Sequence, residues 1–338
     1  MSDEMNQNQE KQEVVNNPQK SPKKKKSKNK GLLVFIIIIV LVLGFGIFKD
    51  FFAENSSLNL VAKNGKNYIA ELYIEGTIQE ENESYNQAWL LETIDTLKND
   101  VSNVGIMLFI NSPGGAVYES DQVYLALLDY SQNKPVWAYL GATAASGGYY
   151  IACSAEKIIA NRNTLTGSIG VIAGQSIDLS EFMAKHGIKM NTITAGKNKN
   201  MLNIDQPLTP EQRAIMQSVA DECYNQFTQI VSTSRNLSKE KVTQLADGRI
   251  YTAQQALKHK LIDEILTYEE AKSQMKIYFT DIKDLTFTEF RYTKEKSFYN
   301  YLFDMYSNVQ GLTSQSSFLE KIMAESSQIE YPAYLYVK

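Results

Sequence analysis

The 338-residue chain has few of the side chains that most often carry chemistry: two histidines, two cysteines and two tryptophans. The histidines, His186 and His259, are far apart, and neither a paired-cysteine pattern nor an HExxH pattern occurs. A zinc site needs such clustered ligands, so we expect neither a metal ion nor an organic cofactor. Two cysteines, Cys153 and Cys223, do not define a disulfide framework, and buried unreactive thiols are expected.

Beyond the N-terminal region, acidic residues outnumber basic ones. Residues 1–30 contain eight Lys and four acidic residues, a balance of +4, whereas the whole chain carries −4, so residues 31–338 sum to −8. Phosphate binding requires clustered Lys and Arg, and an acidic body therefore argues against nucleic acid as a partner.

Residues 31–48 contain no charged side chain, and this run of 18 residues is long enough to cross a bilayer as a helix. Residues 1–30 are polar and Lys-rich, and we expect them to be disordered because they have too few apolar side chains to form a core. We place them in the cytoplasm, because positively charged segments beside a membrane span stay on the cytoplasmic side. No small-residue cleavage site follows the run, which favours a retained transmembrane anchor over a cleaved signal. Residues 49–67 read as a linker to a domain outside the cytoplasmic membrane.

From residue 68 onward, strand and helix patterns alternate. Continuous apolar runs such as residues 104–110 and 135–140 are typical of parallel strands buried on both faces. The expected strands are 69–78, 104–110, 135–140, 157–160, 190–195 and 285–292, and the expected helices are 85–100, 114–131, one from 146, 179–186, 209–236, 238–246 and 252–259. This order predicts βαβ units in an α/β domain over residues 68–275, followed by a C-terminal extension, residues 276–338.

Two segments share one design: residues 109–115 (FINSPGG) and 144–150 (AASGGYY) each contain a pair of glycines expected to open a helix. A helix start has backbone N–H groups without partners, and glycine lets a ligand approach them closely. Side by side, two such ends could hold an oxyanion. Ser146 lies at the second helix start, where it could be a nucleophile or could merely cap the helix.

A serine nucleophile needs a base. No histidine occurs within 35 residues after Ser146, and His186 and His259 both fit structural or solvent positions near helix ends. A Ser-His-Asp arrangement therefore has no obvious candidate. The remaining variant is a Ser-Lys dyad, in which the lysine must be neutral, a state that burial favours.

Six short blocks occur in a fixed order along the chain. They are residues 110–115 (INSPGG), 145–150 (ASGGYY), 166–171 (TGSIGV), 196–199 (GKNK), 208–211 (LTPE) and 248–264 (GRIYTA through LIDE). Together they resemble the bacterial signal peptide peptidase (SppA) family of membrane-anchored serine peptidases, in its single-domain form, over about residues 68–275. The resemblance implies a fold related to Clp-type peptidases and the crotonase superfamily.

The resemblance also implies roles for individual residues. Ser146 would be the nucleophile and Lys199 its general base, with Ser168 hydrogen-bonded to the lysine and orienting it. The chain departs from the family pattern around the base, because asparagines flank Lys199 in place of an aromatic residue and an Asp or Ser. Lys197 therefore remains an alternative base.

The resemblance implies an oxyanion hole made from the backbone N–H of Gly147 and one N–H of the pair Gly114 and Gly115. The sequence does not decide between those two glycines. It further implies a ring-shaped homo-octamer with sites shared between protomers, and hydrophobic peptide substrates such as remnant signal peptides at the outer face of the membrane.

The last ten residues, 329–338 (IEYPAYLYVK), combine β-branched and aromatic side chains. This tail either packs on the domain surface or is disordered, or it lies as an extended strand in or near the substrate groove. Two rival functions remain open. A crotonase-like acyl-CoA enzyme would use a similar oxyanion hole but is disfavoured outside the cytoplasm, and a catalytically inactive membrane scaffold would share the fold.

Overall fold

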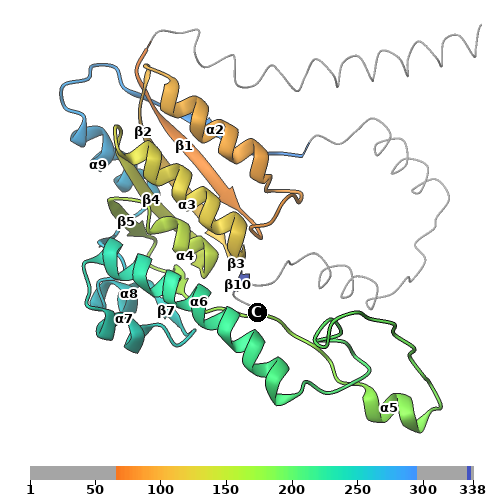
Figure 1. Ribbon diagram of the computed structural model, residues 1–338. Helices are drawn as coiled ribbons and strands as arrows, with labels where there is room; N and C mark the ends of the chain where they lie inside the picture. The colour runs from red at the N-terminus through yellow and green to blue at the C-terminus, as the bar shows by residue number, and fades with distance from the viewer. Residues whose placement is uncertain (1–65, 295–332, 336–338) are drawn as a thin grey trace, which may run out of the picture. The chain divides into compact units, whose positions relative to one another are not determined.

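The computed structural model describes residues 66–294 and 333–335 (Figure 1). The chain divides into two units, Met1–Ala53 and Glu54–Lys338, and the described fold belongs to the second. The expected cytoplasmic tail and membrane anchor, residues 1–48, lie outside the described residues, as does nearly all of the expected linker. Within the described ranges, no helix combines the length and the apolar character needed to cross a membrane.

A sheet of eight strands forms the centre of the described domain. Its hydrogen-bonded order is β7-β6-β4-β2-β1-β9, with β5 paired to β4 and β8 paired to β5. The strands are β1 (Tyr68–Glu75), β2 (Asn103–Ser112), β4 (Val136–Ala145), β5 (Lys157–Ala160), β6 (Leu165–Gly167), β7 (Ile250–Thr252), β8 (Glu264–Ile265) and β9 (Thr286–Phe290). Neighbours pair in parallel except β6 and β7. Parallel neighbours need crossover connections, which the helices supply.

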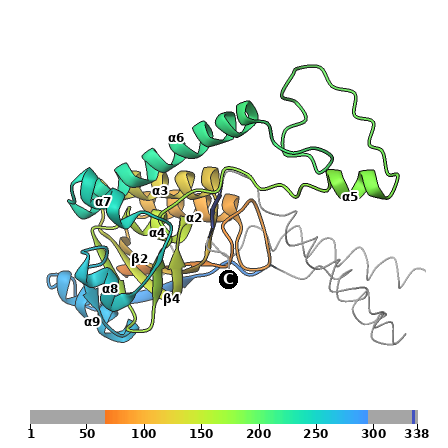
Figure 2. The ribbon, with the colours of Figure 1, turned by 90° about the horizontal axis from the view of Figure 1, so that it is seen from below.

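The sheet separates two hydrophobic cores, because successive side chains of a strand point to opposite faces. Leu72, Leu108 and Leu140 belong to the larger core, whereas Met107 and Tyr139 belong to the smaller. The helices are α2 (Gln87–Asn99), α3 (Val117–Ser131), α4 (Gly147–Ala152), α5 (Ser180–Lys185), α6 (Pro210–Arg235), α7 (Lys239–Leu245), α8 (Ala253–Lys258) and α9 (Tyr268–Tyr278). Helices α2, α3, α4 and α6 lie over the larger core, and α9 lies on the other face (Figure 2). Burial on both faces explains the continuous apolar runs.

The expected α/β organisation is confirmed, but two local predictions were wrong. The glycines expected to open the helix of residues 114–131 instead form a short strand, β3 (Gly114–Ala116), and α3 begins one residue later. Gly114 has φ +99°, which a helix does not accept. Residues 190–195 form no strand, since that segment has no neighbouring strand with which to pair.

The long helix α6 begins and ends where its sequence signals indicate. Thr209 and Gln212 form a capping box, Pro210 occupies the first turn, and Asn236 ends the helix in the left-handed conformation. Residues 172–208, which we call the arm, join β6 to α6 and contain the short helix α5. The arm extends beyond the N-terminal end of α6 (Figures 1 and 2), and most of its side chains are exposed.

Neither cysteine is part of a disulfide. Cys153, at the end of α4, is buried, whereas Cys223 on α6 is half-buried. Burial raises the pKa of the Cys153 thiol to about 12. Because the raised pKa lies far above neutrality, the reactive thiolate forms only as the pH rises towards that value.

A first prediction follows for thiol reactivity. In a Cys223→Ser variant, the remaining Cys153 should be a thiolate in only about one molecule in 10⁴ at pH 8. We expect iodoacetamide to leave the folded variant almost unmodified and to alkylate it fully in guanidinium chloride, as measured by intact mass. Alkylation of the folded and unfolded variant at equal rates would contradict the prediction.

Candidate active site

Ser146 stands at the junction between β4 and α4. Its φ is 54° and its ψ is −119°, a backbone conformation that side-chain-bearing residues rarely adopt. The turn is held from the neighbouring strand, because the Ser146 N–H donates to the Gly167 carbonyl over 2.8 Å. Strained backbone that the surrounding structure maintains is concentrated at functional sites.

The Ser146 side chain is buried, with 1% of its surface exposed. Its Oγ has no hydrogen-bond partner within the described part of the chain and makes no capping bond to α4. The capping alternative is therefore not what the structure shows. A buried hydroxyl without a partner costs about 1–3 kcal/mol, so its presence here fits a group reserved for a ligand.

Helix α4 begins directly against β3. A Cβ added at Gly147, the first residue of α4, would lie 3.2 Å from the Gly115 nitrogen and 2.5 Å from Ser120 Oγ. Only glycine allows this approach of the two backbones. The first N–H groups of α4 have no partner inside the helix, so Gly147 presents a donor close to β3.

Hydrogen bonding separates the two candidate glycines of β3. The Gly114 N–H donates to Ser112 Oγ over 3.0 Å, and its carbonyl accepts from the Ile78 N–H over 2.9 Å. Ala116 N–H donates to the Ile78 carbonyl over 2.8 Å. Because successive residues of a strand direct their N–H groups to opposite sides, the Gly115 N–H points away from Ile78. Gly115 is therefore the candidate oxyanion donor, and the Gly114 N–H is already engaged.

The other side of β3 is occupied by part of the C-terminal tail. Strand β10 (Ala333–Leu335) pairs antiparallel with β3, and Tyr334 lies opposite Gly115 in the register. Extended backbone thus runs beside the glycines that approach the start of α4. The arrangement shows that β3 accepts an added strand on this side.

Ser168 directly follows β6 and has φ 48°. Its N–H donates to the Arg249 carbonyl over 2.8 Å, and its side chain is buried. Ala145 pairs with Gly167 in the sheet register, so the two strands end together and the next residues are Ser146 and Ser168. The structure therefore brings the two serine positions to one edge of the sheet.

The two candidate general bases are not bonded to Ser146. Lys197 and Lys199 lie on the arm with exposed side chains. Lys197 forms an ion pair with Glu211 and thereby lowers the pKa of that carboxyl group. Neither lysine hydrogen-bonds to Ser146 Oγ, and neither histidine does. Within one chain, the structure does not join the expected base to the nucleophile.

Sequence reasoning missed Ile78, Ser112 and Ser120. Ile78 and Ser112 fix the β3 glycines by hydrogen bonds, and Ser120 contacts the start of α4 from the first turns of α3. Ser112 could have been suspected, because a Ser two residues before a turning glycine often bonds its N–H. Nothing local points to Ile78, which meets β3 from another segment.

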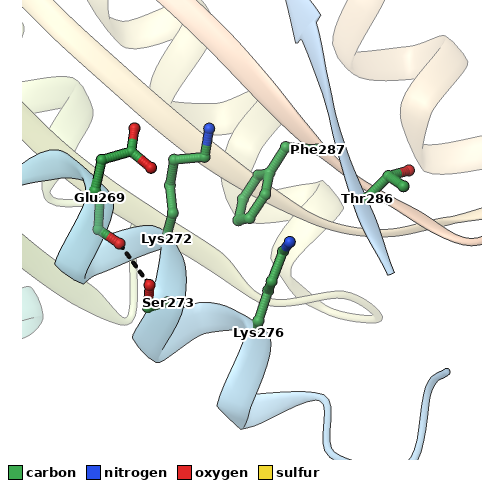
Figure 3. Close-up of a pocket in the computed structure, with 6 residues that line it drawn as sticks. All are labelled: Glu269, Lys272, Ser273, Lys276, Thr286 and Phe287. Carbon is green, nitrogen blue, oxygen red and sulfur yellow. Dashed lines mark hydrogen bonds between the residues drawn. The ribbon is translucent and has the colours of Figure 1, made fainter. Parts of the chain in front are cut away.

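A separate cavity of about 330 Å³ lies on the opposite face of the sheet, between α9 and β9 (Figure 3). Its lysines are engaged: Lys272 pairs with Glu71 over 2.8 Å and lies above the Phe287 ring, as does Lys276. Among residues 66–294 and 333–335, no cluster of three or more His, Cys, Asp or Glu is placed to hold a metal ion. The serine site remains the best candidate for chemistry.

Comparisons with known proteins point to a family of peptidases. The model of peptidase family S49 matches residues 129–280. A candidate protease of Synechocystis sp. is 42% identical over 204 residues, which cover 60% of this chain and 72% of that protein. A candidate signal peptide peptidase SppA of Enterococcus faecium is 33% identical over 243 residues, covering 68% and 70%. Protease 4 of Haemophilus influenzae is 32% identical over 212 residues, covering 62% of this chain and 34% of that protein.

Among solved structures, a ClpP1 mutant from Listeria monocytogenes aligns with a TM-score of 0.41 and 18% sequence identity. The alignment covers 60% of this chain and 92% of that chain.

A second prediction concerns the contact between β3 and Ile78. In Gly115→Ala, the added Cβ would lie 1.8 Å from the Ile78 carbonyl oxygen, so the backbone must move. We expect a loss of about 1–3 kcal/mol in the free energy of unfolding, measured by urea titration. Gly170→Ala is the control, because its nearest neighbour would be 3.3 Å away. Equal stability of the two variants would show that β3 is not held against Ile78 at Gly115.

Proposed function

The chain belongs to peptidase family S49, and from that membership we propose that it is a serine endopeptidase that cleaves hydrophobic peptides with a Ser146–Lys199 dyad. One observation carries the proposal. The Ser146 hydroxyl is buried, has no partner in the described residues, and sits on a strained turn beside the N–H groups of Gly147 and Gly115.

The proposed reaction needs no group beyond the chain and water. Neutral Lys199 accepts the Ser146 proton as Oγ bonds to the peptide carbonyl carbon, and the resulting oxyanion accepts hydrogen bonds from Gly147 and Gly115. The lysine ammonium then gives its proton to the leaving amine as the C–N bond breaks. Water, deprotonated by the lysine, hydrolyses the acyl-enzyme and restores the serine. Ser168 hydrogen-bonds the lysine and holds it towards Ser146.

A second copy of the chain supplies the lysine in this proposal. The arm, which contains Lys199, extends beyond the N-terminal end of α6 and away from α4 (Figures 1 and 2), and the described residues of one chain offer Ser146 no base. The arm also exposes apolar side chains at several positions: Ile177, Phe182, Ile188 and Ile193. Apolar surface of this kind marks protein contacts. Contact with a neighbour would remove water from the lysine amine and favour its neutral form.

An arm that binds the next copy is a head-to-tail contact, and repetition of such a contact closes into a ring when the rotation allows. The octamer implied by the resemblance is one such closed ring. In that ring every copy would supply its Lys199 to one neighbour and receive Lys199 from the other.

The proposed substrate binds as an added strand. Strand β10 lies antiparallel on β3 beside Gly115, and an extended peptide in its place would put a carbonyl against the same N–H groups. The apolar run of residues 31–48 would hold the domain at the outer face of the cytoplasmic membrane, next to remnant signal peptides. The tail itself would then compete with substrate.

A third prediction tests the dyad. Ser146→Ala and Lys199→Ala should each lower kcat on a hydrophobic peptide by at least about 10³-fold, because each removes a reacting group. Thermal unfolding should hardly change. Lys197→Ala is the matched control, since Lys197 lies two residues away and is paired with Glu211. Full activity of either dyad variant would refute the assignment, and loss in Lys197→Ala alone would move the base to Lys197.

The same variants test the origin of the base. Ser146→Ala and Lys199→Ala chains, produced together with different tags, should form mixed assemblies that regain cleavage. Each mixed contact can then pair an intact serine with an intact lysine. Continued inactivity of co-purified mixed assemblies would indicate that the serine and the lysine must come from one chain. Inactivity of the wild-type protein itself would favour a catalytically inactive scaffold.

A fourth prediction concerns the tail. Deleting residues 329–338 should raise the initial rate of peptide cleavage several-fold, because the strand beside β3 becomes available to substrate. Tyr334→Pro is a variant of full length that removes the backbone N–H opposite Gly115 and should raise the rate similarly. Unchanged rates in both variants would show that β10 does not compete.

A further inference from the structure

Three helices that follow the three parts of the proposed site meet at one group of polar side chains. Helix α3 follows the β3 glycines, α4 follows Ser146, and α6 follows the arm that contains Lys199. Each contributes one member of the group: Asp121 from α3, Tyr150 from α4 and Gln226 from α6. The neighbouring placement of α3, α4 and α6 is visible in Figure 1.

The three side chains form a closed set of hydrogen bonds. The Tyr150 hydroxyl donates to Asp121 Oδ1 over 2.6 Å. Gln226 Nε2 donates to the same Oδ1 over 3.0 Å and to the Tyr150 hydroxyl oxygen over 2.7 Å. Hydrogen bonds to a charged acceptor are the stronger kind, so the carboxylate of Asp121 is the centre of the group.

Tyr150 links this group to the nucleophile through the backbone. Its N–H donates to the Ser146 carbonyl over 2.8 Å, which closes the first turn of α4. Its ring is fully buried and contacts the rings of Tyr124 and Phe227 at centroid distances of 5.3 and 5.0 Å. The ring contacts pack α4 against α3 and α6, and the hydrogen bonds of the hydroxyl group fix the orientation of α4.

We propose that Asp121, Tyr150 and Gln226 are positioning residues of the peptidase, an inference that rests on the proposed function. Asp121 and Tyr150 fix α4 relative to α3, and thereby the spacing between the donor N–H groups of Gly147 and Gly115. Gln226 connects α6, the helix that follows the arm with Lys199, to the same group of side chains. A displacement of about 1 Å in such a site can cost about 10²-fold in rate.

The decisive comparison is between two neighbouring tyrosines. Tyr149 is also fully buried on α4, but its hydroxyl donates to the Leu261 carbonyl over 2.7 Å, away from the three-helix group. Tyr150→Phe keeps the ring and loses only the hydroxyl, and so does Tyr149→Phe. With a hydrophobic peptide and the full chain, Tyr150→Phe should lower kcat about tenfold or more with KM within about twofold. Tyr149→Phe should keep kcat near wild type even where it lowers thermal stability.

Conservative variants of the other two members separate position from packing. Asp121→Asn keeps an oxygen acceptor and should retain most of kcat, whereas Asp121→Ala should lose it to the extent of Tyr150→Phe. Gln226→Ala should also lower kcat, while Gln229→Ala, whose amide bonds Thr233 within the same helix, should not. The Asp121 pair decides the question if Tyr150→Phe does not fold.

The outcomes distinguish this inference from the function on which it rests. If Ser146→Ala is inactive but Tyr150→Phe and Asp121→Ala keep wild-type kcat, the positioning role is wrong and the peptidase proposal stands. Equal losses in Tyr150→Phe and Tyr149→Phe, in proportion to lost stability, would reduce the group to packing. Full activity of Ser146→Ala would overturn both proposals together.

Discussion

The structure depends on the approach of two backbones, where the start of α4 meets β3. At this point a Cβ on Gly147 would lie 3.2 Å from the Gly115 nitrogen, and a Cβ on Gly115 would lie 1.8 Å from the Ile78 carbonyl oxygen. Glycine at both positions removes the only atoms that would keep the segments apart. The consequence is that backbone N–H groups of α4 and β3 lie close together next to Ser146, while side chains such as Ser112 hold the segments that carry them.

The rest of the domain holds that approach in place. Parallel strands β2 and β4 end together beneath it, so one sheet edge carries β3, Ser146 and, through β6, Ser168. Both faces of the sheet are covered by helices, which buries the strands from which these turns leave. Ser146 and Ser168 have positive φ and are tolerated because their N–H groups are bonded at 2.8 Å, that of Ser146 to Gly167 of β6 and that of Ser168 to Arg249, just before β7.

Local signals in the sequence predicted the α/β order, the extent of α6 and the helix that starts next to Ser146, because each depends on neighbouring residues. The conformation of Gly114 and Gly115 depends on Ile78, a partner from another segment, and there the helix prediction was wrong. Residues 190–195 alternate like a strand, but a strand needs a neighbour that no local pattern provides. The distance from Lys199 to a serine is set by the course of the arm, which spacing along the chain does not determine.

The exposed arm has a consequence for newly made copies. A hydrolase that is complete as soon as it folds is a hazard to every other polypeptide around it. The described residues of one chain leave its own serine without a base. If a neighbouring copy supplies the amine as proposed, a single copy would be inactive until it associates with another. Association of copies would then complete the site, and dissociation on dilution would separate the serine from its base.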